Sequence, residues 1–196
     1  DEIRWAKFTG ISWLGDEGFF YSRFPETEEG QDFQSLNYNQ KVYFHRLGTP
    51  QSEDELVYET PQFKEQGHGL GVTDDGRWAF IYSSTGTDNR NELRMIDLAN
   101  RADGSWQTRD IVTGFENEWS PIASTGDTVY FMTNKDAPRY RIVRADLTQP
   151  TLEWEEVIPQ GDNPISGASI IGDRLVVEFM QDASSRAVYY DLDGNR

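Results

Sequence analysis

The sequence predicts an all-β protein made of repeated antiparallel sheets, about four blades of an incomplete β-propeller. Three observations predict this fold. Gly-Asp-type turns recur between runs rich in β-branched and aromatic residues, which is typical of β-hairpins. The unit formed by a turn and its runs recurs roughly every 45–50 residues, the period of a propeller blade. No window carries the sustained i, i+3, i+4 apolar stripe of an amphipathic helix.

The first two strands of each unit flank its turn. The four turns are GDEG at 15–18, DDGR at 74–77, GDT at 126–128 and GDR at 172–174. An apolar segment precedes each turn, and the runs 19–24, 78–83, 129–133 and 175–180 follow them. Because these runs are mostly β-branched or aromatic, we expect each of them to form a strand.

A third run follows in every unit and ends in a leucine. The four runs are 42–47, 93–98, 142–147 and 187–192. Five positions before the leucine the residue is apolar in every unit: Val42, Leu93, Ile142 and Ala187. One position before the leucine it is charged in every unit. Since these two positions lie on one face of a strand, that face is expected to pass from buried to solvent-exposed.

A fourth run completes three of the units, at 55–59, 106–112 and 153–158. The chain ends before the last unit has a fourth run. The predicted blades are therefore 8–59, 69–112, 119–158 and 166–196, the last one incomplete, within a single partial propeller over 1–196. A β-sandwich with chance spacing is the alternative fold.

Composition excludes several classes of partner and site. The chain has 34 acidic and 18 basic side chains and a formal charge of −16, so it repels phosphate and anionic membranes and is expected to bind neither nucleic acid nor a membrane. It has no cysteine, which excludes disulfides, thiolate metal sites and a cysteine nucleophile. It starts at Asp1 with no visible signal peptide, so we expect a processed or partial chain, and the compartment, cytoplasmic or periplasmic, stays open.

Two histidines are the candidate general bases. His45 lies within a third run and His68 within GHGLG, and both are interpreted as packed or surface residues rather than catalytic ones. The nucleophile motif G-x-S-x-G is approached only at 10–14 and 167–171, where the second glycine is missing. Ser12 and Ser169 are therefore expected in the first, inner strand of a unit, and no catalytic residue is predicted.

Three acidic clusters and one acidic turn are further candidate sites. EDE at 53–55, ENE at 116–118 and EWEE at 153–156 are interpreted as chance clusters of an acidic chain. The alternative is a propeller-type glycosidase in which two of these carboxylates act together and Trp119 and Trp154 stack a sugar. DLDGN at 191–195 resembles the start of a calcium loop but lacks the third ligand and the closing glutamate, so a turn is expected. The sequence thus predicts no metal site and no cofactor.

Four stretches resemble one known family. QKVYFHRLGTPQSEDELVYE at 40–59 and TNKDAPRYRIVRADL at 133–147 resemble propeller segments of the prolyl oligopeptidase (prolyl endopeptidase) family. The stretches 7–25 and 70–98 resemble further segments in the same order. The likeness covers essentially the whole chain. Within 40–59, the polar loop between the two apolar runs is interpreted as a connector.

The resemblance implies that this chain supports a peptidase reaction whose catalytic residues lie on another domain. Family members are serine peptidases that cut short peptides after proline, and they join an α/β-hydrolase domain to a seven-bladed propeller that limits access to the active site. This chain is then expected to be the central part of that propeller, with the hydrolase domain and short proline-containing peptides as partners. Val57 stands where some members carry a cysteine near the substrate pocket, so it is expected in the wall of that pocket.

Two further expectations remain open. The alternative function is a free-standing propeller-type module that binds a peptide or a protein. Four isolated blades leave two apolar end faces uncovered, so the chain is also expected to self-associate through its end blades.

Overall fold

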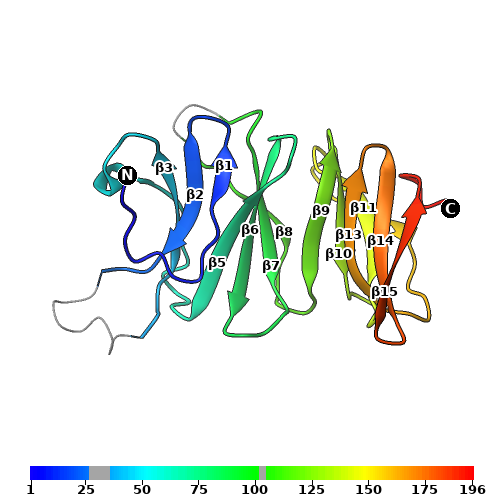
Figure 1. The fold of residues 1–196 in the computed structure, drawn as a ribbon. Helices are drawn as coiled ribbons and strands as arrows, with labels where there is room; N and C mark the ends of the chain where they lie inside the picture. Colours follow the sequence, from blue (N-terminus) through cyan, green and yellow to red (C-terminus); the bar gives the residue numbers. More distant parts are fainter. Residues whose placement is uncertain (27–35, 102–104) are drawn as a thin grey trace. The chain divides into compact units, whose positions relative to one another are not determined.

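The computed structural model describes residues 1–26, 36–101 and 105–196, and it confirms an all-β fold (Figure 1). The described strands form four antiparallel sheets, each a meander of consecutive strands. In the described ranges no helix is long and apolar enough to cross a membrane. The chain divides into two compact units, Asp1–Gly114 and Phe115–Arg196.

The first unit contains two four-stranded sheets. The first sheet consists of β1 (Ser12–Leu14), β2 (Gly18–Arg23), β3 (Lys41–Arg46) and β4 (Glu55–Tyr58), with the short 3-10 helix η1 (Gln51–Glu53) between β3 and β4. The second consists of β5 (Gln66–Val72), β6 (Trp78–Thr85), β7 (Glu92–Asp97) and β8 (Arg109–Val112). Strand order within each sheet equals chain order, as the repeat predicts.

The second unit contains one sheet of four strands and one of three. The four-stranded sheet consists of β9 (Trp119–Thr125), β10 (Thr128–Thr133), β11 (Arg141–Asp146) and β12 (Glu155–Ile158). The other consists of β13 (Ile165–Ile171), β14 (Arg174–Gln181) and β15 (Ser184–Tyr190). The sheets start at Gln66 and Ile165, before the predicted blade starts at 69 and 166, and the blade limits as domains stay a prediction.

Apolar residues on facing sheets form the core of the first unit. The members from the two sheets are Phe20, Val42, Phe44, Val57, Ala79, Ile81 and Ile96. Trp106, on the segment between β7 and β8, lies over the first sheet with its ring 5.0 Å from both Phe20 and Phe44. Its indole Nε1–H donates to Glu55 at 3.0 Å. Trp106 therefore joins the two sheets through both apolar and polar contacts.

The core of the second unit is built in the same way. Its buried members are Tyr130, Ile142, Val157, Ile158, Ile165, Leu175 and Val177. The guanidinium of Arg144 binds Glu155 through two hydrogen bonds of 2.8 and 2.9 Å. It also donates to the carbonyl oxygen of Leu192 at 3.0 Å and to Asp193 at 2.7 Å. Arg144 thus fixes the turn after β15 to the preceding sheet.

The predicted burial of the third-run position holds in three units and is wrong in the fourth. Val42, Leu93 and Ile142 have no exposed surface, whereas Ala187 is exposed. Val42 and Ile142 face the sheet that follows in their own unit. Ala187 pairs with the exposed Glu178, and no sheet follows the fourth one among residues 105–196 to cover it.

Backbone geometry explains why the Gly-Asp turns form hairpins. Gly126 and Gly172 have positive φ values of 67° and 62° while the aspartates after them do not, the φ pattern of a type II′ turn. The turn between β14 and β15 is different, because Asp182 and Ala183 both have positive φ, at 49° and 58°. That is the pattern of a type I′ turn, here without glycine.

Candidate functional site

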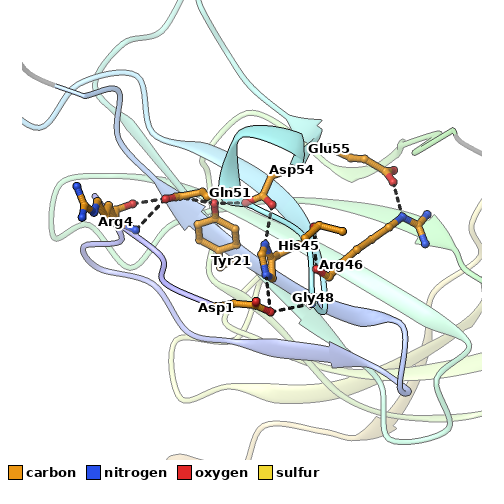
Figure 2. Close-up of polar contacts among 10 residues, drawn as sticks. Asp1, Arg4, Tyr21, His45, Arg46, Gly48, Gln51, Asp54 and Glu55 are labelled. Carbon is orange, nitrogen blue, oxygen red and sulfur yellow. Dashed lines mark hydrogen bonds and ion pairs between the residues drawn. The ribbon is translucent and has the colours of Figure 1, made fainter.

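The loop interpreted as a connector does join β3 to β4, and it also supplies a buried polar network that was not predicted (Figure 2). His45 on β3 and Asp54 after η1 have fully buried side chains, and His45 Nδ1 lies 2.7 Å from Asp54 Oδ1. The hydroxyl of Tyr21 donates to Asp54 Oδ2 at 2.5 Å. Burial, and then this hydrogen bond, raises the pKa of Tyr21 above its ordinary value. A buried carboxylate needs such partners because desolvation is costly.

The same network holds the N-terminal segment against the first sheet (Figure 2). Asp1 Oδ2 accepts from the backbone N–H of Gly48 at 2.8 Å and lies 3.3 Å from His45 Nε2. The amide of Gln51 accepts from the backbone N–H of Arg4 at 3.0 Å and donates to its carbonyl at 3.1 Å. Among the described residues His45 therefore lies between two carboxylates, and its ring nitrogens contact no hydroxyl. It is buried in β3, one of the two environments that the sequence predicted for it.

His68 is buried in a different environment. Its Nε2 lies 2.9 Å from the hydroxyl of Thr60 and its Nδ1 lies 2.9 Å from the hydroxyl of Ser83. Burial, helped by the nearby charge of Arg94, lowers the pKa of His68 to about 4. The ring is thus neutral at pH 7 and is held by two hydroxyls, with no carboxylate on either nitrogen. It is packed in β5, as expected.

The serine candidates lie where the sequence placed them. Ser12 is in β1 and Ser169 in β13, each the first strand of a sheet. The hydroxyl of Ser12 donates to the carbonyl oxygen of Leu70 at 2.8 Å. This contact joins β1 to β5, and the Ser12 hydroxyl is hydrogen-bonded to neither His45 nor His68 in the described residues.

The carboxylates of the acidic clusters are largely engaged by neighbouring groups. Glu55 accepts from Arg46 at 3.0 Å, and Glu118 accepts from the hydroxyl of Tyr140 at 2.6 Å. Glu155 and Glu156 bind Arg144 and Arg141. These contacts are ion pairs with arginines and one hydrogen bond from a tyrosine, and they give no support to the glycosidase alternative.

The two tryptophans considered as a sugar platform pack against each other with their ring planes tilted by 45°. The ring of Trp119 lies 4.7 Å from that of Trp154, and Trp154 lies 5.3 Å from Phe131 at its edge. Trp119 is buried. Each of the two indoles is therefore packed against another aromatic ring of the second unit.

The DLDGN segment forms the predicted turn. Asp191 Oδ1 accepts from the backbone N–H groups of Asp193 and Asn195 at 3.0 and 2.8 Å, and Oδ2 accepts from the Asn195 side chain at 3.0 Å. The hydrogen bonds from Asn195 lower the pKa of Asp191. Both oxygens of this carboxylate serve the turn itself. Among the described residues no group of three or more potential ligands could hold a metal ion.

Val57 lies in β4 and is almost fully buried in the core of the first unit. It packs with Val42 and Phe44 rather than projecting into solvent. Two residues further on, Glu59 lines a cavity of about 340 Å3 together with Lys41 and Thr60. The place of Val57 in a substrate pocket stays a prediction.

A larger cavity, of about 500 Å3, lies in the first unit and was not predicted from the sequence. Phe8, Phe24, Gln40, Glu65 and Tyr82 are among its lining residues, together with Gly67 and Gly69. Phe8 is 81% exposed and has a φ of 52°, a conformation that costs a non-glycine residue about 1–2 kcal/mol. The Gly-His-Gly-Leu-Gly alternation of 67–71 was the available signal for this cavity.

Repeated four-stranded antiparallel meanders in chain order define the chain as a β-propeller protein. Its sequence matches the family described as prolyl oligopeptidase, N-terminal β-propeller domain, over residues 1–196. The chain therefore belongs to the prolyl oligopeptidase N-terminal β-propeller family.

Curated relatives support the same assignment. The chain is 39% identical over 190 residues to the prolyl endopeptidase of Elizabethkingia meningoseptica, covering 96% of this chain and 26% of that protein. It is 34% identical over 205 residues to prolyl oligopeptidase A of Amanita bisporigera, covering 100% of this chain and 27% of that protein. The chain thus spans about a quarter of the length of these relatives.

Solved structures have the same fold. A chain from a structural and mechanistic analysis of two prolyl endopeptidases superposes with a TM-score of 0.87 at 36% identity, over 98% of this chain and 27% of that chain. Prolyl oligopeptidase B from Galerina marginata, bound to a 35mer hydrolysis and macrocyclization substrate, superposes with a TM-score of 0.89 at 25% identity. The superposition covers 97% of this chain and 26% of that chain.

Proposed function

We propose that this chain is part of the propeller of a proline-specific serine peptidase and limits the access of short peptides to a hydrolase domain outside these residues. The family match over all 196 residues carries the proposal. Relatives bearing the name prolyl endopeptidase support this activity for the longer protein. Short proline-containing peptides are the proposed substrates.

The histidine environments support a non-catalytic role for the chain itself. A serine peptidase needs a histidine that contacts a serine hydroxyl on one nitrogen and a carboxylate on the other. His45 contacts carboxylates on both sides, and His68 contacts hydroxyls on both sides. The nucleophile and its base are therefore proposed to lie on the hydrolase domain.

A chimera tests the gating function. Residues 1–196 would replace the matching quarter of the Elizabethkingia meningoseptica prolyl endopeptidase. The chimera should cleave a chromogenic Gly-Pro peptide and leave a folded protein of more than about 100 residues uncut. Cleavage of the Gly-Pro peptide by the 196-residue chain alone would overturn the proposal. A chimera that cuts short peptides and folded proteins alike would overturn the gating part.

Val57 is proposed to lie in the wall of the substrate pocket of the longer protein. Its proximity in sequence to Glu59 and the adjoining cavity supports this position. In the chimera, Val57→Cys should make peptidase activity sensitive to a thiol-reactive reagent, and a bound peptide should slow that inactivation. Unchanged activity after complete modification of Cys at this position would contradict the role.

A free-standing interaction module is the alternative function, and no contact of the described residues favours it. The chimera separates the two proposals, because a module evolved for another partner would not restore size-limited peptidase activity.

The isolated chain is further proposed to self-associate through its last sheet. In the described residues β15 pairs only with β14, and Tyr189 and Ile171 of that sheet are 63% and 65% exposed. An exposed apolar edge strand favours pairing with another copy. Sedimentation should show a dimer that Tyr189→Lys weakens, and a monomer of 22.5 kDa at micromolar concentration would contradict this.

A further inference from the structure

Gly67 and Gly69 of β5 line the cavity of about 500 Å3 in the first unit, which we call the glycine-face cavity. These two glycines alternate with His68, so they lie on one face of the strand. Nothing lies within 4 Å of a Cβ built on Gly69. A strand whose face carries no side chains lets a ligand approach the backbone closely.

Two backbone groups on the edge of β5 that faces away from β6 are already hydrogen-bonded to side chains, which favours a ligand that lies against the glycine face over one that extends the sheet. The backbone N–H of His68 donates to Gln40 Oε1 at 2.8 Å. The carbonyl oxygen of Leu70 accepts from the hydroxyl of Ser12 at 2.8 Å. Both groups would otherwise be available to an added strand.

Phe8 is presented at this cavity by the fold. Its ring is 81% exposed and its backbone adopts an unfavourable left-handed conformation. The side-chain amide of Gln40 donates to the carbonyl oxygens of Lys7 at 3.0 Å and Phe8 at 3.4 Å, which holds the segment in place. Gln40 itself is buried. Strain that orients an exposed aromatic ring is typical of a binding site.

The charge of the cavity favours a cation. Glu65 lines it, and no lysine or arginine is among the described residues that do. Burial lowers the pKa of His68 to about 4, so this ring adds no positive charge at pH 7. Lys64 lies over the ring of Tyr38 at 4.6 Å rather than in the cavity. Aromatic faces such as those of Phe8 and Tyr82 attract cations as well.

We propose that the glycine-face cavity binds the positively charged amino terminus of a short peptide, with Glu65 as its counter-charge and Phe8 as an aromatic wall. The choice of a peptide as ligand rests on the proposed function, whereas the preference for a cation rests on the cavity alone. This adds a propeller subsite that selects peptides by their free amine.

The test is an NMR titration of the 196-residue chain with two matched probes, Gly-Phe-Pro-amide and its N-acetylated form. The free-amine probe should shift the backbone amide signals of Gly67, Gly69 and Gly86 in a saturable way. It should bind about three- to fivefold more tightly than the acetylated probe, the effect of one exposed ion pair. Glu65→Gln should abolish this preference.

Control variants separate a local effect from a general one. Glu116→Gln removes an exposed carboxylate of the second unit and should leave the preference unchanged. Phe8→Leu should weaken binding of the free-amine probe about threefold through loss of the aromatic face. Leucine is chosen over alanine because it keeps an apolar side chain at this position and so preserves the fold.

The proposal is overturned if neither probe shifts these three glycines in a saturable way, or if Glu65→Gln keeps the preference. This result does not depend on the chimera. The titration measures binding without peptidase activity, so failure of the gating proposal would leave the subsite standing, and failure here would leave gating untouched.

Discussion

His45 and Asp54 form a fully buried pair whose nearest atoms, Nδ1 and Oδ1, lie 2.7 Å apart. His45 lies near the end of β3, and Asp54 follows the 3-10 helix η1, so the pair ties the β3–β4 loop to the strand before it. Tyr21 and Gln51 attach to the same group of atoms and extend it to the N-terminal segment. In the Gln-Ser-Glu-Asp string, Asp54 thus has a fully buried side chain, whereas Gln51 is partly buried and joins the N-terminal segment to the network.

Removing one partner of this pair should be strongly destabilising. Asp54→Ala leaves His45 and the Tyr21 hydroxyl buried without their acceptor, and we expect a loss of about 3–5 kcal/mol in the free energy of unfolding. Urea denaturation followed by circular dichroism measures it. Asp88→Ala, which breaks the exposed pair of Asp88 and Arg90, is the control and should change nothing measurable. A similar result for both variants would contradict a buried network.

Acid should weaken the fold through His68. Its pKa is about 4 in the folded chain against an ordinary 6.5, so between these values the unfolded chain binds the proton first. The contribution of His68 to the free energy of unfolding is complete above pH 6.5. It falls as the pH drops toward 4, by at most about 1.4 kcal/mol per pH unit. Urea midpoints of wild type and His68→Gln at pH 7, 6, 5 and 4 should therefore converge. Parallel curves would disprove this contribution.

Ala183→Gly should stabilise the protein. Ala183 occupies a left-handed position at φ 58°, where glycine has no Cβ to strain, and we expect a gain of about 1 kcal/mol. The melting temperature of the variant checks this. Ala99→Gly is the matched control, because Ala99 is also exposed but lacks a positive φ, and it should lower the melting temperature slightly.

Gly18→Ala should disrupt the pairing of β2 with β3. A Cβ at this position would lie 2.0 Å from the carbonyl oxygen of His45, so the backbone itself must move. We expect a loss of about 3 kcal/mol or more, at or above the upper end of overpacking effects. Gly10→Ala adds the same atom where nothing lies within 4 Å and should be tolerated. Equal stability of the two variants would contradict the close approach.

Trp106→Ala should separate the two sheets of the first unit. The change removes an indole packed on Phe20 and Phe44 and its hydrogen bond to Glu55. We expect a loss of about 3 kcal/mol, the lower end for a buried tryptophan because Trp106 is only partly buried. Trp13→Ala is the control, since its side chain is 54% exposed, and it should cost clearly less under the same urea titration.

The strands and their order could be predicted because their signals are local. A Gly-Asp pair between apolar runs specifies a hairpin without reference to the rest of the chain, as Gly126 and Gly172 show. The Asp182–Ala183 turn lacks glycine and gave no such signal. The exposure of Ala187 could not be predicted, because burial at that position depends on a neighbouring sheet and not on the strand itself.

The buried network and the glycine-face cavity depend on contacts between distant residues. Asp54 looks like any loop acid in the sequence, and only the approach of Tyr21, 33 positions away, turns it into a buried acceptor. Gln40 and His68 are 28 positions apart, and the cavity beside them needs both sheets of the unit. Local sequence patterns carry no information on contacts between residues so far apart in the chain. The alternating glycines of 67–71 did indicate one wall of the cavity.

The meander topology has a consequence for biosynthesis. Every strand in a sheet pairs with its immediate predecessor or successor along the chain, so no sheet must wait for a distant segment to leave the ribosome. Each meander is expected to assemble as soon as its own stretch of nascent polypeptide has emerged, and the later docking of one meander on another then becomes the slow, vectorial part of maturation.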